Sequence, residues 1–149
     1  MDAIDRELLN EIQTRFPITG KPFQDLGVRL NCSEEEVLTR VKTLKSMGII
    51  RRIGGNFDSK RLGFATTLCA ARVPEDKIQG FVEVVNRYPE VTHNYLRDNP
   101  YNIWFTFVAR SWEVVEGYIE EIKEKTGVRD ILNLPAVRTF KILVNFDLG

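Results

Sequence analysis

Residues 91–107 read VTHNYLRDNPYNIWFTF, and this stretch predicts one β-hairpin around which the rest of the chain is organised. Successive side chains of a strand point to opposite faces, so residues two apart share a face. On the first strand the expected row is Val91, His93, Tyr95 and Arg97, against Thr92, Asn94 and Leu96. Asp98, Asn99 and Pro100 supply turn chemistry. On the return strand the expected rows are Tyr101, Ile103, Phe105 and Phe107, against Asn102, Trp104, Thr106 and Val108.

The row on the first strand combines a histidine, a phenol and a guanidinium. Aromatic rings stack on planar ligands, arginine pairs carboxylates through two parallel hydrogen bonds, and histidine supplies a proton or a metal-ligand nitrogen. The row therefore suits a planar, anionic, aromatic ligand. Two alternatives stay open: the row is a solvated face of an antiparallel sheet, or a polar homodimer interface.

The composition is that of a globular protein. The chain has 149 residues, of which 43% are hydrophobic, enough for one domain or two small ones. No apolar run approaches a membrane span, and the acidic start at Asp2 and Asp5 differs from a signal peptide. Cys32 and Cys69 are isolated and suit free thiols in a reducing compartment. We expect a soluble, cytoplasmic protein without a membrane partner.

The first part, residues 1–64, has the pattern of a winged helix-turn-helix domain. Apolar spacing and end signals predict helices over residues 2–15, from Pro22 to near Asn31, and after Ser33, where Ser33 and Glu36 have capping-box spacing. A short strand at 49–53 and an extended piece around Phe57 would form the wing.

The second part, residues 65–149, changes to an α+β pattern. The expected order is a strand at 66–73, a helix at 75–88, the hairpin, a helix from Ser111 to about Lys125, and an extended region over 128–146 broken at Pro135. This βαββαβ order is ferredoxin-like. Its two helices would cover one face of an antiparallel sheet and leave the other face free for a ligand or partner.

A helix-turn-helix raises the question of DNA binding. The leading residues of the third helix, which would meet base edges, are Ser33, Glu34, Glu35 and Glu36. Three carboxylates oppose phosphate contact, and the 21 basic residues are balanced by 21 acidic ones, so no overall basic field attracts nucleic acid. We therefore do not expect a nucleic-acid partner, although weak backbone contact through residues further along the helix stays open.

Arg51 and Arg52 are the second cationic feature, in the predicted wing. One alternative is that they keep the wing soluble or touch DNA backbone. The other is that the wing supplies a carboxylate-binding arginine to the second domain, in which case only one of the two can face a given site.

The two-part plan resembles the Lrp/AsnC family of transcriptional regulators across the chain, including LGVRLNCSEEEVLTRVKTLKSMGIIRRIGG at residues 26–55. A narrower resemblance is to the siroheme decarboxylases, enzymes of the alternative heme and heme d1 pathways built on that regulator fold. It is carried by RRIGGNFDSKRLGF (51–64), TLCAARVP (67–74), residues 91–107, and LPAVRTFKILVNF (134–146). Asn99 departs from the family pattern, which allows a histidine in this turn.

The resemblance implies a carboxy-lyase subunit that removes the C12 and C18 acetate carboxylates of siroheme, giving 12,18-didecarboxysiroheme, together with a homologous second subunit in a heterodimer or higher assembly. It implies no cofactor beyond the substrate's own iron, with siroheme or heme as the ligand. His93, Arg97 and Tyr95 are the expected catalytic residues, with His93 as proton donor or axial iron ligand. The expected substrate-binding residues are Arg51, Arg52, Tyr101, Asn102 and Trp104. The alternatives are an Lrp/AsnC-type DNA-binding regulator with a small-molecule effector domain, and a structural subunit whose partner holds the working residues.

Overall fold

The computed structural model describes residues 1–55, 57–142, 145–146 and 148, which form two compact units. The first unit takes in Met1–Gly55 together with the segment from Lys141, and the second ends at Phe140. The division therefore falls at residue 55 rather than at the predicted residue 64, and the C-terminal segment belongs to the first unit. Its attachment there is visible at Gln13, whose side chain exchanges two hydrogen bonds with the Phe146 backbone, at 2.9 and 3.2 Å.

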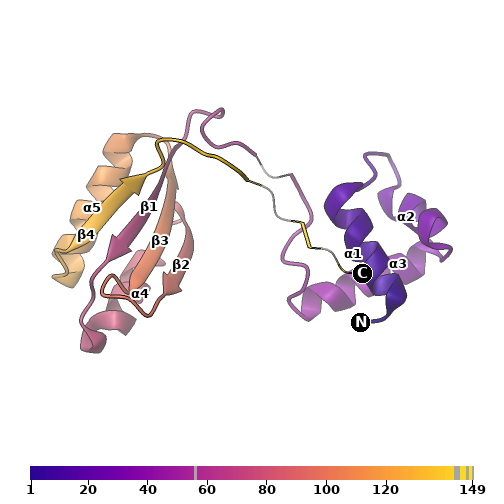
Figure 1. Ribbon diagram of the computed structural model, residues 1–149, viewed down its shortest axis with the longest axis horizontal. Coiled ribbons are helices and arrows are strands. Elements are labelled where there is room, and N and C mark those ends of the chain that lie inside the picture. Colours follow the sequence, from indigo (N-terminus) through magenta and orange to yellow (C-terminus); the bar gives the residue numbers. More distant parts are fainter. Residues whose placement is uncertain (56, 143–144, 147, 149) are drawn as a thin grey trace. The chain divides into compact units, whose positions relative to one another are not determined.

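The first unit contains the three predicted helices, α1 (Ala3–Thr14), α2 (Pro22–Leu30) and α3 (Glu34–Ser46) (Figure 1). Asp2 caps α1 through a complete capping box with Asp5. The Ser33 hydroxyl caps α3 by accepting the Glu36 N–H, but the Glu36 carboxylate binds Arg40 instead of closing the predicted box. The apolar faces meet in a core of fully or nearly fully buried side chains from all three helices: Leu8, Leu9, Leu26, Val37, Val41 and Leu44. None of the helices in the described part of the chain is long and apolar enough to cross a membrane.

The turn between α2 and α3 is tight, as a helix-turn-helix requires. Asn31 adopts a left-handed conformation with φ of 54° at the end of α2. Gly27 faces this turn, and a Cβ atom there would lie 2.7 Å from the Cys32 carbonyl oxygen. The absence of a side chain at Gly27 therefore lets α2 approach the start of α3.

The predicted wing is wrong for the described residues, because neither 49–53 nor the stretch around Phe57 forms a strand; Asn56 lies outside the described part. Ile50 is buried in the helical core, while Arg51 and Arg52 are exposed. An isolated two-stranded ribbon buries little apolar surface and is marginal alone, which accounts for the failure. Because Arg51 and Arg52 are not in a strand, alternation does not restrict which of the two can face a site.

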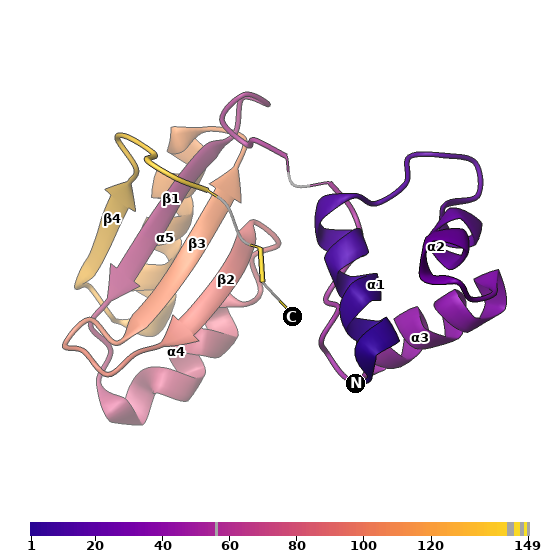
Figure 2. The same ribbon diagram turned by 45° about the vertical axis from the view of Figure 1, so that its right-hand side comes forward.

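The second unit has the predicted ferredoxin-like order. Its elements are β1 (Ala65–Ala71), η1 (Glu75–Lys77), α4 (Ile78–Val85), β2 (Val91–Leu96), β3 (Ile103–Ala109), α5 (Trp112–Thr126) and β4 (Ile131–Pro135). The strands form one antiparallel sheet in the order β2-β3-β1-β4. Figures 1 and 2 show α4 and α5 on the same side of this sheet. The predicted extended region is a strand only as far as Pro135 among its described residues; residues 143 and 144 lie outside them.

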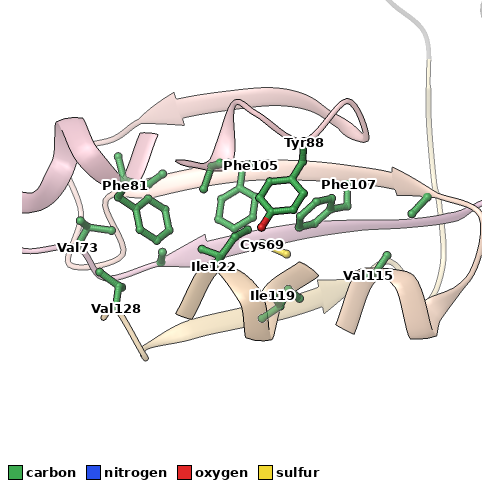
Figure 3. Close-up of a cluster of buried hydrophobic side chains, with 14 of the residues drawn as sticks. Cys69, Val73, Phe81, Tyr88, Phe105, Phe107, Val115, Ile119, Ile122 and Val128 are labelled. Carbon is green, nitrogen blue, oxygen red and sulfur yellow. The ribbon is translucent and has the colours of Figure 1, made fainter. Parts of the chain in front are cut away.

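The core of the second unit fills the space between the sheet and its two helices (Figure 3). Phe105 and Phe107 of β3 are fully buried there, and Phe105 packs edge-on against Phe81 of α4. Ser111 caps α5 at its start, and Gly127, at φ of 69°, ends it. One face of the sheet thus packs against the two helices. The other face, which we call the open face, carries no helix of this unit.

Candidate functional site

The open face presents two rows of side chains that cross all four strands. The strand register aligns His93 with Thr106, and Tyr95 with Trp104. Continuing across β1 and β4, the first row is His93, Thr106, Leu68 and Leu134, and the second is Tyr95, Trp104, Ala70 and Leu132. The polar and aromatic groups therefore lie toward the β2 edge, and the aliphatic groups lie toward β4.

A β-bulge in β2 determines which side chains reach this face. Val91 is aligned with Phe107 and His93 with Thr106, so Thr92 is an extra residue in β2. Val91 packs against the helix-covered core, whereas His93 shares the opposite face with Tyr95. The prediction that Val91 and His93 share a face is therefore wrong, because the extra residue reverses the alternation. His93 and Tyr95 do share a face, as predicted.

His93 is exposed and makes two contacts with its neighbours on β2. Its Nδ1 lies 3.0 Å from the Thr92 hydroxyl oxygen, and its ring stacks on that of Tyr95 with 6.0 Å between centroids and 27° between planes. A cavity of about 360 Å³ lies at the β2 edge on the side of α4, where Asn94 and Leu96 line it together with Val82 and Asn86 from α4 and its end. On the open face the imidazole is accessible because His93 itself is exposed.

Arg97 and Trp104 form the second half of the cluster. The Arg97 guanidinium lies over the Trp104 ring at 4.8 Å from its centroid, a cation–π contact. The indole is held in place because its Nε1–H donates to the Tyr101 carbonyl oxygen at 2.6 Å. Among the described residues no carboxylate pairs with Arg97, so its side-chain donors are available to an anionic ligand.

Two predicted binding residues are engaged elsewhere. The Tyr101 hydroxyl donates to Asp130 at 2.9 Å, and Arg72 lies over the Tyr101 ring while pairing with the same carboxylate. The Asn102 side chain accepts the Val73 N–H at 2.9 Å and donates to the Val73 carbonyl at 2.8 Å. Both side chains tie the turn end of the hairpin to neighbouring segments of the chain.

Arg51 and Arg52 lie in the first unit, and the cluster on the open face is built without them. Arg52 donates to the Gly55 carbonyl at 3.4 Å. Among the described residues no carboxylate pairs with either side chain. Both guanidinium groups therefore retain the capacity to bind a carboxylate.

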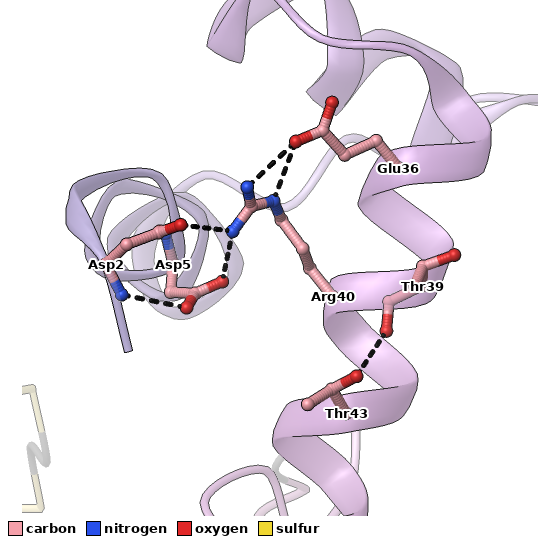
Figure 4. Close-up of polar contacts among 6 residues, drawn as sticks. All are labelled: Asp2, Asp5, Glu36, Thr39, Arg40 and Thr43. Carbon is pink, nitrogen blue, oxygen red and sulfur yellow. Dashed lines mark hydrogen bonds and ion pairs between the residues drawn. The ribbon is translucent and has the colours of Figure 1, made fainter.

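The leading surface of α3 is rich in carboxylates. Arg40 is surrounded by carboxylates, pairing with Asp2 and Glu36 at 2.8 Å and with Asp5 at 2.9 Å (Figure 4). The hydrogen bonds that Arg40 donates to these three carboxylates raise the pKa of its guanidinium, and they pair its charge within the unit. With Glu34 and Glu35 beside it, the start of α3 presents negative charge to solvent.

Sequence reasoning missed Thr92 because a bulge has no composition signature in this stretch. It also missed Leu68, Leu132 and Leu134, whose side chains are 37%, 38% and 41% exposed on the open face. The sequence carried little signal for Leu68, because this apolar residue is exposed while its polar neighbour Thr67 is buried. The exposure of the three leucines extends an apolar surface beside the aromatic cluster.

Comparison with protein-family models assigns both parts of the chain. Residues 5–51 match a siroheme decarboxylase NirDL-like HTH domain, and residues 61–141 match an AsnC-like ligand binding domain. The fold itself is shared with transcriptional regulators: the structure of E. coli AsnC superimposes with a TM-score of 0.77, at 18% identity, over 97% of each chain.

Relatives with higher identity are enzymes. The siroheme decarboxylase alpha subunit of Desulfovibrio desulfuricans is 54% identical over 148 residues, which is 99% of this chain and 85% of that protein. The crystal structure of siroheme decarboxylase NirDL in complex with an iron-uroporphyrin III analogue is 30% identical with a TM-score of 0.65, covering 95% of this chain and 48% of that one. By the extent of this similarity, the chain belongs to the siroheme decarboxylase family.

Proposed function

We propose that the chain is one subunit of an enzyme that removes the carboxyl groups of the C12 and C18 acetate side chains of siroheme, giving 12,18-didecarboxysiroheme. The observation that carries the proposal is the cluster of His93, Tyr95, Arg97 and Trp104 on one side of the hairpin, in a chain that belongs to this family. The cluster offers cationic, aromatic and imidazole groups to a ligand that is itself anionic, planar and iron-containing.

Arg97 binds a carboxylate of the substrate. Its donors have no carboxylate partner among the described residues, and the planar guanidinium matches a carboxylate through two parallel hydrogen bonds. The Trp104 ring beneath it restricts the guanidinium before substrate arrives, which lowers the entropic cost of binding. The exposed surfaces of Trp104 and Tyr95 pack against the macrocycle.

His93 acts at the reacting centre as an axial ligand to the substrate's iron or as the proton donor. In each decarboxylation the bond between the acetate methylene and its carboxylate carbon breaks, carbon dioxide leaves, and the electron pair passes to the methylene carbon and its conjugated ring. A proton then adds to that carbon and gives a methyl group. The macrocycle accepts the electron density, so the step needs no organic cofactor. A neutral imidazole nitrogen cannot bind iron and donate a proton at once.

The remaining predicted residues have secondary roles. Arg51 or Arg52 binds a further carboxylate of the substrate, since both are exposed and without a carboxylate partner in the described part of the chain. Tyr101 and Asn102 act indirectly. Tyr101 holds the Trp104 indole through its carbonyl oxygen, and Asn102 binds the turn end of the hairpin to Val73.

A homologous second subunit covers the β4 side of the open face. Leu68, Leu132 and Leu134 are each more than a third exposed there, and an exposed apolar patch beside polar groups is typical of a protein interface. The relatives are described as subunits, which agrees with this arrangement. The protein works in the cytoplasm, in keeping with its two free cysteines, Cys32 and Cys69.

The test is turnover of siroheme under anaerobic conditions. Purified protein is mixed with siroheme, with and without the homologous subunit, and the absorption spectrum and product mass are followed. A product lighter by two molecules of carbon dioxide is expected, and a dependence on the second subunit shows whether one chain suffices. Unchanged substrate mass in the presence of both subunits would contradict the proposal, and a simultaneous lack of any spectral change would favour a regulator of the Lrp/AsnC type.

A further inference from the structure

The Thr92 hydroxyl lies between the His93 ring and a backbone carbonyl. Its oxygen is 3.0 Å from His93 Nδ1 and 3.4 Å from the Thr106 carbonyl oxygen, toward which it donates. A hydroxyl carries one proton and can donate once, while its oxygen can accept a second hydrogen bond. If its proton is directed at the Thr106 carbonyl, only a lone pair faces His93, so Nδ1 must carry the hydrogen of that contact.

From this geometry we propose that Thr92 is a positioning residue that holds neutral His93 as the Nδ1–H tautomer, with Nε2 unprotonated. The contact between the two side chains depends on the bulge. Adjacent residues of a regular strand point to opposite faces, so a hydroxyl at position 92 would turn away from a ring at position 93. Because Thr92 is the extra residue of β2, its side chain is re-aimed toward the His93 ring.

The chemical consequence rests on the proposed function. An unprotonated Nε2 has a lone pair available to bind the substrate's iron or to accept a proton. A neutral ring in this tautomer cannot donate a proton from Nε2, because its only N–H is held by Thr92. The tautomer therefore suits neutral His93 to ligation of the substrate's iron or to accepting a proton, and neutral His93 cannot itself protonate the product through Nε2.

Nuclear magnetic resonance of the protein labelled with ¹⁵N-histidine reads the tautomer directly. His93 is the only histidine, so both ring nitrogen signals belong to it without further assignment. Spectra of the free protein are recorded at increasing pH until the ring signals stop changing, which isolates the neutral form. We expect a protonated, pyrrole-type signal for Nδ1 and a pyridine-type signal for Nε2.

Three variants sharpen the test. Thr92→Val keeps the side-chain shape without the hydroxyl and is expected to move the proton toward Nε2, whereas Thr92→Ser is expected to restore the wild-type pattern. Thr43→Val, in the first unit, removes a hydroxyl that likewise donates to a backbone carbonyl, at 3.0 Å, and is expected to leave the signals unchanged. An Nε2–H tautomer in the wild-type protein would overturn the proposal, as would an unchanged tautomer in folded Thr92→Val.

Siroheme turnover provides a separate readout. Losing one neutral hydrogen bond corresponds to roughly a two- to tenfold fall in kcat/KM for Thr92→Val, with recovery in Thr92→Ser. If the tautomer is as proposed but siroheme is not converted by the wild-type protein, the proposed function fails while the assignment of Thr92 stands. If Thr92→Val will not fold, the wild-type tautomer alone decides.

Discussion

Replacing Arg97 by lysine tests the carboxylate-binding role of this side chain. The guanidinium lies 4.8 Å from the centre of the Trp104 ring and has no carboxylate partner among the described residues, so a substrate carboxylate would be its anionic partner. Lysine keeps the charge but cannot form two parallel hydrogen bonds. A hydrogen bond to a charged group contributes about 1.5–3 kcal/mol, and each 1.36 kcal/mol is tenfold in rate. We therefore expect kcat/KM for siroheme to fall roughly ten- to 150-fold.

The assay is anaerobic conversion of siroheme followed by product mass, with the homologous subunit present. Arg87→Lys, at an exposed position after α4, is the matched control and should retain wild-type kcat/KM. Thermal unfolding should be nearly unchanged in both variants because both arginines are exposed. Wild-type kcat/KM in Arg97→Lys would refute the role assigned to Arg97, and so would an equal loss in Arg87→Lys.

The other predictions concern stability and reactivity. Phe105→Ala removes a fully buried ring, and urea unfolding should show a loss of about 3–5 kcal/mol; a loss below about 1 kcal/mol would contradict the packing described. Burial raises the pKa of Cys69 to about 12, so alkylation of the folded protein at about pH 8 should modify the half-buried Cys32 before Cys69. Both thiols should be alkylated in urea. Equal alkylation rates of the two thiols in the folded protein would contradict this expectation. The Asp5 backbone N–H and Arg40 lower the pKa of Asp2 in the folded protein. The stability of the fold that is linked to this shift is present above the ordinary aspartate value of 3.8, and it is lost as the pH falls through the lowered pKa. The difference in unfolding midpoint between wild type and Asp2→Asn should therefore shrink below about pH 4.

Local signals in the sequence were sufficient for the helices and the sheet order. Ser33 and Ser111 mark helix starts by capping chemistry that depends on the nearest residues alone, and the structure confirms both. The alternation of buried and half-buried residues along β3 is equally local. The ferredoxin-like topology follows, because few arrangements bury two amphipathic helices against four antiparallel strands.

The parts that failed depend on contacts distant in the sequence. The predicted strand at 49–53 did not form because Ile50 is buried among the helices instead. The bulge at Thr92 depends on how β2 aligns with β3, and no residue type in this stretch predicts it. Asn102 likewise hydrogen-bonds to Val73, which lies 29 residues away in the sequence, and local sequence patterns do not show this contact.

The central claim is that the His93 side of the open face is where siroheme reacts. The most direct measurement is the mass of the tetrapyrrole recovered after anaerobic incubation of siroheme with His93→Ala and the homologous subunit, compared with wild type and Arg87→Lys. We expect wild type and Arg87→Lys to release two molecules of carbon dioxide from siroheme, and His93→Ala to leave both acetates in place over the same time. Didecarboxylated product formed by His93→Ala at the wild-type rate would contradict the central claim.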